Sequence, residues 1–178
     1  MRIYPLMIAC SLAITTYIIS NEAKAHWQFY KNKESNFNDL NINWRDNIKY
    51  HSKRLKFDRN NKESLFGRAL ARGKVKNYRG ALKDINKLIK KDSKYKNLAI
   101  RFRAWFHEGL GNYSEAIDDF SYLIENNEFL KDSYSYRGFM KDLLHDQKGA
   151  CSDWKIGGEL GNQDALSAFK NHCINLSS

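Results

Sequence analysis

The sequence predicts an all-α fold, a solenoid of about three helical hairpins closed by a C-terminal capping helix. One short pattern recurs and ends at Ala81, Ala116 and Ala150, which lie 35 and 34 residues apart. Each alanine is followed three residues later by an aspartate and four residues later by a bulky side chain. In the first two units, apolar residues at i, i+1, i+4, i+7 and i+8 form one helical face. Because one hairpin cannot bury this face alone, neighbouring hairpins must stack.

This period, with a small and then a large residue, resembles the tetratricopeptide repeat (TPR), a helix–turn–helix unit. An arginine followed by a small residue keeps the same register in each first helix, at Arg68-Ala69, Arg103-Ala104 and Arg137-Gly138. The chain resembles a short exported bacterial type, as in cyanobacteria, and residues 154–165 resemble the end of a Sel1-like repeat. It departs from the family in lacking the proline that usually closes each second helix, because its only proline is Pro5.

Residues 1–25 are typical of a signal peptide. Arg2 supplies a positive start, an apolar run follows, and Ala23-Lys24-Ala25 has the small-x-small form of a cleavage site. We expect cleavage after Ala25. An uncleaved membrane anchor is the alternative, because the apolar run is nearly long enough to span a bilayer, and a lipoprotein attached at Cys10 is a third reading.

Residues 26–61 form an arm rich in aromatic residues, Asn and Lys. One reading places a helix from Trp44 to Asp58, since Ile48 and Leu55 precede Leu82 and Ile89 by 34 residues. This helix would be the second helix of a decayed repeat. The alternative is an irregular arm.

Three hairpins are expected at 62–90, 97–126 and 131–160, within repeat units 62–96, 97–130 and 131–161. In the third unit, Gly157 and Gly158 replace larger residues and would let another helix come close. Residues 162–178 supply that helix and a tail: Gly161-Asn162 turns the chain, and Ala165, Leu166 and Phe169 share one face of the capping helix.

Charge is unevenly distributed in this chain of 178 residues with a net charge of +10. Lys and Arg crowd residues 49–103, whereas Asp and Glu dominate residues 108–159. The basic part would suit an anionic membrane surface, an acidic protein or nucleic acid, or it is simply a solvated face. Export argues against nucleic acid as a partner.

No catalytic pattern is present. The five histidines are scattered, no glycine-rich phosphate loop occurs, and Asp118-Asp119 are successive helix positions that do not converge on one substrate atom. We therefore expect no enzyme activity, no small-molecule substrate, no cofactor and no metal. The one alternative is a metal site formed near the cap by His145, Cys151, His172 and Cys173.

The TPR resemblance implies a concave groove lined by the first helix of each hairpin, which takes a segment of a protein partner. The positions that it assigns to the groove are Phe66, Leu70, Arg101, Trp105, Ser135 and Phe139. Apolar anchors with one arginine would suit a mostly apolar peptide that carries a carboxylate. Trp105 has a second reading as a core residue. The function expected is therefore an exported protein-interaction scaffold, or else a membrane-surface tether held by an uncleaved N-terminus and the basic stretch.

A disulfide between Cys151 and Cys173 is also expected. Loss of Cys10 with the signal peptide would leave these two cysteines in an oxidising compartment. Asn162 in the turn lies midway between them, so both would stand at the same height in an antiparallel hairpin. The alternative is a buried Cys151 and a separate, exposed Cys173.

Overall fold

The computed structural model describes residues 43–91 and 94–173. Over these residues it is all-helical and contains no strand, which confirms the predicted fold class. The eight helices of this part are α3 (Trp44–Phe57), α4 (Lys62–Lys74), α5 (Tyr78–Lys91), α6 (Lys96–Leu110), α7 (Tyr113–Glu125), α8 (Leu130–Leu143), α9 (Gln147–Glu159) and α10 (Gln163–His172). The expected signal peptide and residues 26–42 of the expected arm lie outside the described residues.

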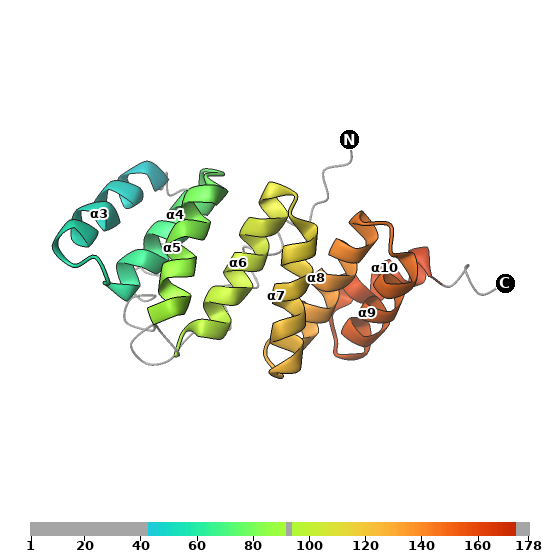
Figure 1. Cartoon of the computed structure of the whole chain (residues 1–178). Helices are drawn as coiled ribbons and strands as arrows, with labels where there is room; N and C mark the ends of the chain where they lie inside the picture. Colours follow the sequence, from blue (N-terminus) through green and yellow to red (C-terminus); the bar gives the residue numbers. More distant parts are fainter. Residues whose placement is uncertain (1–42, 92–93, 174–178) are drawn as a thin grey trace. The chain divides into compact units, whose positions relative to one another are not determined.

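The helices stack in chain order, each packed against the next (Figure 1). α4 and α5, α6 and α7, and α8 and α9 form the three hairpins, and α10 contacts both α8 and α9. α3 packs on α4 in the place that α5 and α7 take on α6 and α8. It therefore occupies the position of the second helix of a preceding repeat, the first of the two readings of this stretch.

The repeated alanines and bulky residues form the core. Ala81, Ala116 and Ala150 have no exposed surface, and the side chain that follows each of them one turn later is at most 1% exposed. These bulky residues are Ile85, Phe120 and Trp154. Full burial of such a side chain contributes about 1.5–3 kcal/mol. Gly138 makes room for the largest of them, because a Cβ there would lie 2.6 Å from an atom of the Trp154 ring.

The turn inside each hairpin requires a left-handed backbone at one repeated position. Lys76, Gly111 and His145 occupy it, with φ angles of 61°, 77° and 64°. Gly111 adopts this conformation without steric cost, whereas the conformation costs a residue with a Cβ about 1–2 kcal/mol. The first and third turns are therefore held in shape by the helices that they join rather than by their own residues.

The capping helix α10 seals the last hairpin at two glycines, as their positions in the sequence suggested. A Cβ on Gly157 would lie 3.1 Å from the Cβ of Ala165, and one on Gly158 would lie 3.1 Å from the Cα of Leu166. The Asn162 side chain begins the helix by accepting a hydrogen bond from the Ala165 amide at 2.9 Å. Backbone-to-backbone contact at the glycines lets a ten-residue helix cover the end of the solenoid.

Among the described residues, no helix is long and apolar enough to cross a membrane.

Candidate functional site

An aromatic row runs along the first helices of the hairpins. Its rings contact one another in T-shaped pairs: Phe66 with Phe102 at 5.1 Å between centroids, Phe102 with Trp105 at 4.9 Å, and Trp105 with Tyr136 at 6.0 Å. Phe66, Trp105 and Tyr136 are partly exposed, and Phe102 is buried beneath them. We call these four residues the aromatic row. It joins α4, α6 and α8 by side-chain contacts.

The predicted groove residues divide into two groups. Phe66 and Trp105 belong to the aromatic row, while Leu70 is a partly exposed residue of α4. Phe139 is also partly exposed, but its ring packs on Trp154 at 5.2 Å. The structure thus leaves these four apolar residues with some accessible surface. It does not do so for the two polar ones.

Arg101 is not a groove cation, which corrects the sequence-based assignment. Its side chain is 4% exposed and pairs with Asp132, with 2.6 Å between the guanidinium nitrogen and the carboxylate oxygen. The guanidinium carbon lies 5.0 Å from the centroid of the Trp105 ring and 4.7 Å from that of Phe129. Arg101 therefore joins α6 to α8 inside the protein, and its charge is already neutralised.

Ser135 is likewise internal, which is the second correction. It is 1% exposed, and its hydroxyl donates to Oδ1 of Asn162 at 3.3 Å. The Asn162 amide in turn reaches Asp132 at 3.4 Å. Arg101, Asp132, Asn162 and Ser135 form one polar cluster that ties α6 and α8 to the start of the capping helix. A serine in this cluster positions the cap and offers nothing to a partner.

The Trp105 indole nitrogen is buried and finds no acceptor in the described part of the chain. Buried indole N–H groups usually have a hydrogen-bond partner, and leaving one unpaired costs about 1–3 kcal/mol. The unpaired donor lies in the middle of the aromatic row.

Sequence reasoning missed a ladder of three buried ion pairs, one inside each hairpin. In each pair an arginine of the first helix holds the aspartate 16 residues later on the second helix through two nitrogens. The pairs are Arg68–Asp84, Arg103–Asp119 and Arg137–Asp153. The aspartate side chains are only 3–5% exposed. Because the same separation recurs in all three units, it was a signal that could have revealed the ladder.

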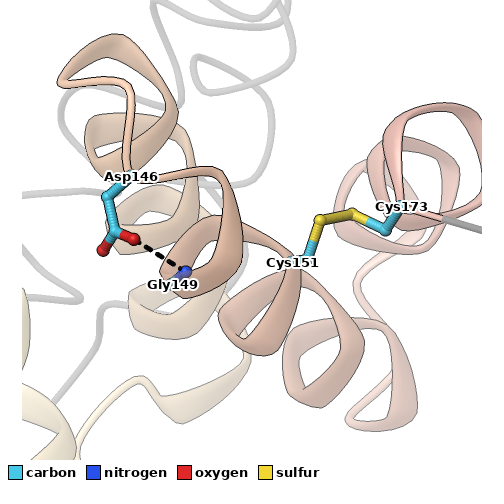
Figure 2. Close-up of a disulfide and its surroundings, with 4 residues drawn as sticks. All are labelled: Asp146, Gly149, Cys151 and Cys173. Atoms are coloured by element: carbon cyan, nitrogen blue, oxygen red, sulfur yellow. Dashed lines mark hydrogen bonds between the residues drawn. A yellow bond between two sulfur atoms is a disulfide. The ribbon is translucent and has the colours of Figure 1, made fainter. Parts of the chain in front are cut away.

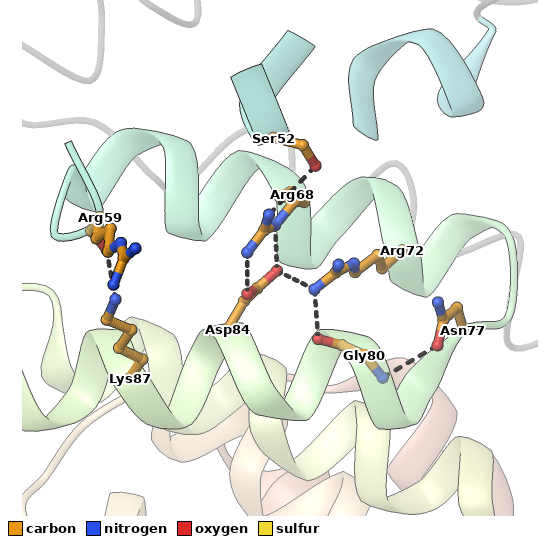
Figure 3. A network of polar contacts seen from close by, with 8 residues as sticks. All are labelled: Ser52, Arg59, Arg68, Arg72, Asn77, Gly80, Asp84 and Lys87. Atoms are coloured by element: carbon orange, nitrogen blue, oxygen red, sulfur yellow. Dashed lines mark hydrogen bonds and ion pairs between the residues drawn. The ribbon is translucent and has the colours of Figure 1, made fainter. Parts of the chain in front are cut away.

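Each ladder arginine also reaches the helix before its own hairpin. Arg68 donates to the Ser52 hydroxyl of α3 at 3.2 Å (Figure 3). In the next two hairpins, Arg103 donates to Asn86 at 3.3 Å and Arg137 donates to Ser121 at 3.0 Å. Every ladder arginine therefore holds three consecutive helices together. The contact of Ser52 also places α3 in the register of a second helix.

The middle hairpin differs from its neighbours in its second cation. Asp84 is held additionally by Arg72 at 2.6 Å and Asp153 by Lys141 at 2.9 Å, whereas His107 stands at the equivalent position of the middle hairpin. Burial lowers the pKa of His107, with Asp119 opposing and Arg103 reinforcing the change. Burial also raises the pKa of Asp119, although Arg103 counteracts it.

These directions give the middle hairpin a distinct pH response. A histidine whose folded pKa lies below 6.5 takes up its proton more readily when unfolded. The contribution of neutral His107 to the stability of the folded state is therefore present above pH 6.5, and it is lost as the pH falls through the folded pKa. For Asp119 the sign is opposite, because its folded pKa is raised. Asp119 therefore stabilises the native state below the ordinary pKa of 3.8, and this stabilisation is lost as the pH rises through the folded pKa.

In the structure, Cys151 of α9 and Cys173 at the end of α10 form a disulfide, with 5.7 Å between their Cα atoms (Figure 2). Asp146 begins the same helix α9 by accepting a hydrogen bond from the Gly149 amide at 2.9 Å. Within residues 43–91 and 94–173, no three His, Cys, Asp or Glu side chains converge in a way that could hold a metal ion. Both cysteines of the alternative metal site are consumed by the bridge.

Comparisons with known proteins give the fold. The chain matches no protein-family model, and no curated protein matches it. Two crystal structures of the protein MamA are similar, each with a TM-score of 0.60 and 18% sequence identity. The first match covers 78% of this chain and 89% of MamA, and the second covers 85% and 90%. At this identity the likeness concerns architecture, and the architecture of this chain is a TPR-type helical solenoid.

Proposed function

We propose that this protein is a binding scaffold that holds a segment of another protein against the aromatic row. The observation that carries the proposal is the row itself: partly exposed rings on three successive first helices, connected by T-shaped contacts. Aromatic side chains in such a position supply large contact area at low conformational cost, and they dominate many protein interfaces. Leu70 and Phe139 occupy the repeat position of Trp105 on α4 and α8 and are also partly exposed.

The polar cluster changes the expected chemistry of the partner. Because Arg101 is paired with Asp132, it is not free to bind a carboxylate of the partner. A segment with apolar or aromatic anchors is therefore favoured over an acidic one. Binding, without chemistry or a cofactor, is the proposed mode of action.

Site-specific photocross-linking tests this proposal. A photoreactive phenylalanine analogue placed at Leu70 should give a discrete adduct with a protein partner in the organism of origin. The matched control carries the same analogue at Lys155, an exposed residue of α9, and should give none. Identical adducts from both positions would show that the protein binds through some other surface. Loss of the adduct when Trp105 is replaced by alanine would locate the contact on the aromatic row.

Export is part of the proposal, in keeping with a short exported bacterial scaffold. The small-x-small sequence before His26 supports removal of residues 1–25, and a disulfide fits an oxidising compartment. N-terminal sequencing of the protein from its native host tests it. A first residue of His26 is expected, and an intact N-terminus would contradict cleavage.

The second candidate function is a tether at an anionic membrane surface. The observation that favours it is the excess of lysine and arginine on α3 and α5. It requires the N-terminal segment to stay attached. Flotation of residues 26–178 with anionic and with neutral vesicles tests the contribution of the basic stretch, because a basic surface that contacts the membrane should float only with the anionic ones. Nucleic acid is not proposed as a partner.

A further inference from the structure

A basic pocket lies between α3, α4 and α5, away from the aromatic row. It has a volume of about 310 Å³ and contains none of the predicted groove residues. Its lining includes five cationic side chains and a single carboxylate. Asp84 at its base is already held by Arg68 and Arg72, so it does not neutralise the other cations (Figure 3). The pocket therefore carries a strong positive charge.

One of the cations at the rim is held in place without being neutralised. The Lys87 ammonium group donates a hydrogen bond to the backbone carbonyl of Arg59 (Figure 3). This bond links α5 to the turn that follows α3. Within the described residues, no carboxylate forms an ion pair with Lys56, Arg59, Lys83 or Lys87. A neutral carbonyl fixes the position of a charge but leaves it available. Four such charges around one concave surface would attract an anion.

The repeat itself does not require these cations. In the repeat register, Glu125 occupies the place of Lys56 in the third interface, Glu128 that of Arg59, and Ser152 and Ile156 those of Lys83 and Lys87. In the second interface, Tyr122 stands in the place of Lys87, and its ring is covered by the Lys96 ammonium at 4.9 Å. The same scaffold thus forms at the third interface without these four cations. At the second interface Lys90 keeps the place of Lys56, whereas Asp118 replaces Lys83. In the described residues the full set of four cations belongs to the first interface.

We propose that this pocket binds the phosphate group of a small soluble ligand, such as a phosphate monoester or pyrophosphate. A doubly charged phosphate has several acceptor oxygens and can engage lysine and arginine from two helices at once. The volume is near the lower end of the range for small-molecule sites, about 300–1,000 Å³. This site adds a ligand to the proposed scaffold and does not depend on its protein partner.

Titration of the full chain with pyrophosphate, followed by calorimetry at a constant salt concentration of about 0.1 M, tests the proposal. The test variant carries Lys56→Ser and Lys83→Ser, two exposed pocket residues from α3 and α5. The matched control carries Lys53→Ser and Lys90→Ser, two exposed residues of the same helices outside the lining. The net charge changes equally in both variants. Neither pocket lysine forms an ion pair within the described residues, so both variants should fold, as circular dichroism would verify.

We expect the test variant to bind pyrophosphate about tenfold more weakly than the unchanged chain, because the two exposed charged contacts that it loses are together worth roughly 1.4 kcal/mol. The control should differ by less than about twofold. Equal weakening in both variants, or no binding by the unchanged chain at about 1 mM pyrophosphate, would overturn the proposal. Flotation with vesicles containing phosphatidate separates the sources of phosphate. Binding to these vesicles but not to pyrophosphate would assign the charge to a membrane and refute the soluble ligand.

Discussion

Replacement of Asp119 by alanine should destabilise the protein by about 3 kcal/mol, whereas the same change at its neighbour Asp118 should cost less than about 0.5 kcal/mol. The two aspartates are adjacent on α7 and differ only in surroundings. The Asp119 side chain is 5% exposed and accepts hydrogen bonds from two nitrogens of Arg103. Asp118 is exposed. The pair thus compares a ladder carboxylate with a solvated one in the same helix.

The magnitude follows from what the substitution leaves behind. Removing one partner of a buried ion pair typically costs about 3–5 kcal/mol, because the remaining charge stays buried and unpaired. Arg103 is 28% exposed and can turn partly toward water, so the lower end of this range applies. Burial already raises the pKa of Asp119, which shows that its ionised form carries a desolvation cost in the native state. Both considerations point to about 3 kcal/mol rather than 5.

Urea unfolding at pH 7.5, followed by far-UV circular dichroism, measures the difference. Adding Arg103→Ala to Asp119→Ala should cost less than the sum of the single changes, because the two residues form one interaction. If Asp119→Ala and Asp118→Ala agreed within about 0.5 kcal/mol, the ladder would contribute nothing to stability and the reasoning would be refuted.

Three further outcomes are expected. The paired change Cys151→Ser with Cys173→Ser should lower the stability by about 3 kcal/mol on the chain-entropy estimate for a separation of 22 residues. Thiol alkylation followed by mass measurement should find no free thiol in the unreduced wild type, and two labels there would exclude the bridge. His107→Lys should reduce the loss of stability between pH 7.5 and 5.5 measured by urea unfolding, because a permanent cation replaces a histidine with a lowered pKa. An unchanged dependence of stability on pH would show that other groups cause this loss. Phe120→Ala should lower the stability by about 3–5 kcal/mol, and Trp105→Ala by less than half as much, since Phe120 is 1% exposed while Trp105 is only partly buried. Equal losses of stability in thermal melts would make Trp105 a core residue.

The helical repeat could be predicted because its determinants are local. Ala81 and Ile85 lie one turn apart on one helix, and the same small and large pair recurs with a constant period. A period of this kind fixes both the type of each element and the neighbour against which it packs. For the same reason, the register of Leu55 with the later repeats gave the helix α3 as one of the two readings of this stretch.

The roles of the polar residues could not be predicted in the same way. Arg101 finds its partner Asp132 31 residues away on the next hairpin, and Ser135 finds Asn162 27 residues away. Such contacts depend on how the hairpins stack, which periodicity alone does not specify. A position in the repeat gives the place of a residue on its helix. The stacking of the hairpins decides whether its polar group already pairs with a neighbouring side chain.

The ladder arginines make the solenoid modular. Excision of residues 82–116, one whole period, would join Ala81 to Ile117 and bring Asp119 to the position that Asp84 now holds. Arg68 would then meet an aspartate at the same separation, and Ser52 would remain within its reach. A chain shortened in this way should fold as a two-hairpin protein, and a non-cooperative thermal transition would argue against this. Gain or loss of whole periods that keep the ladder in register is thus a route by which the length of such a chain could change during evolution.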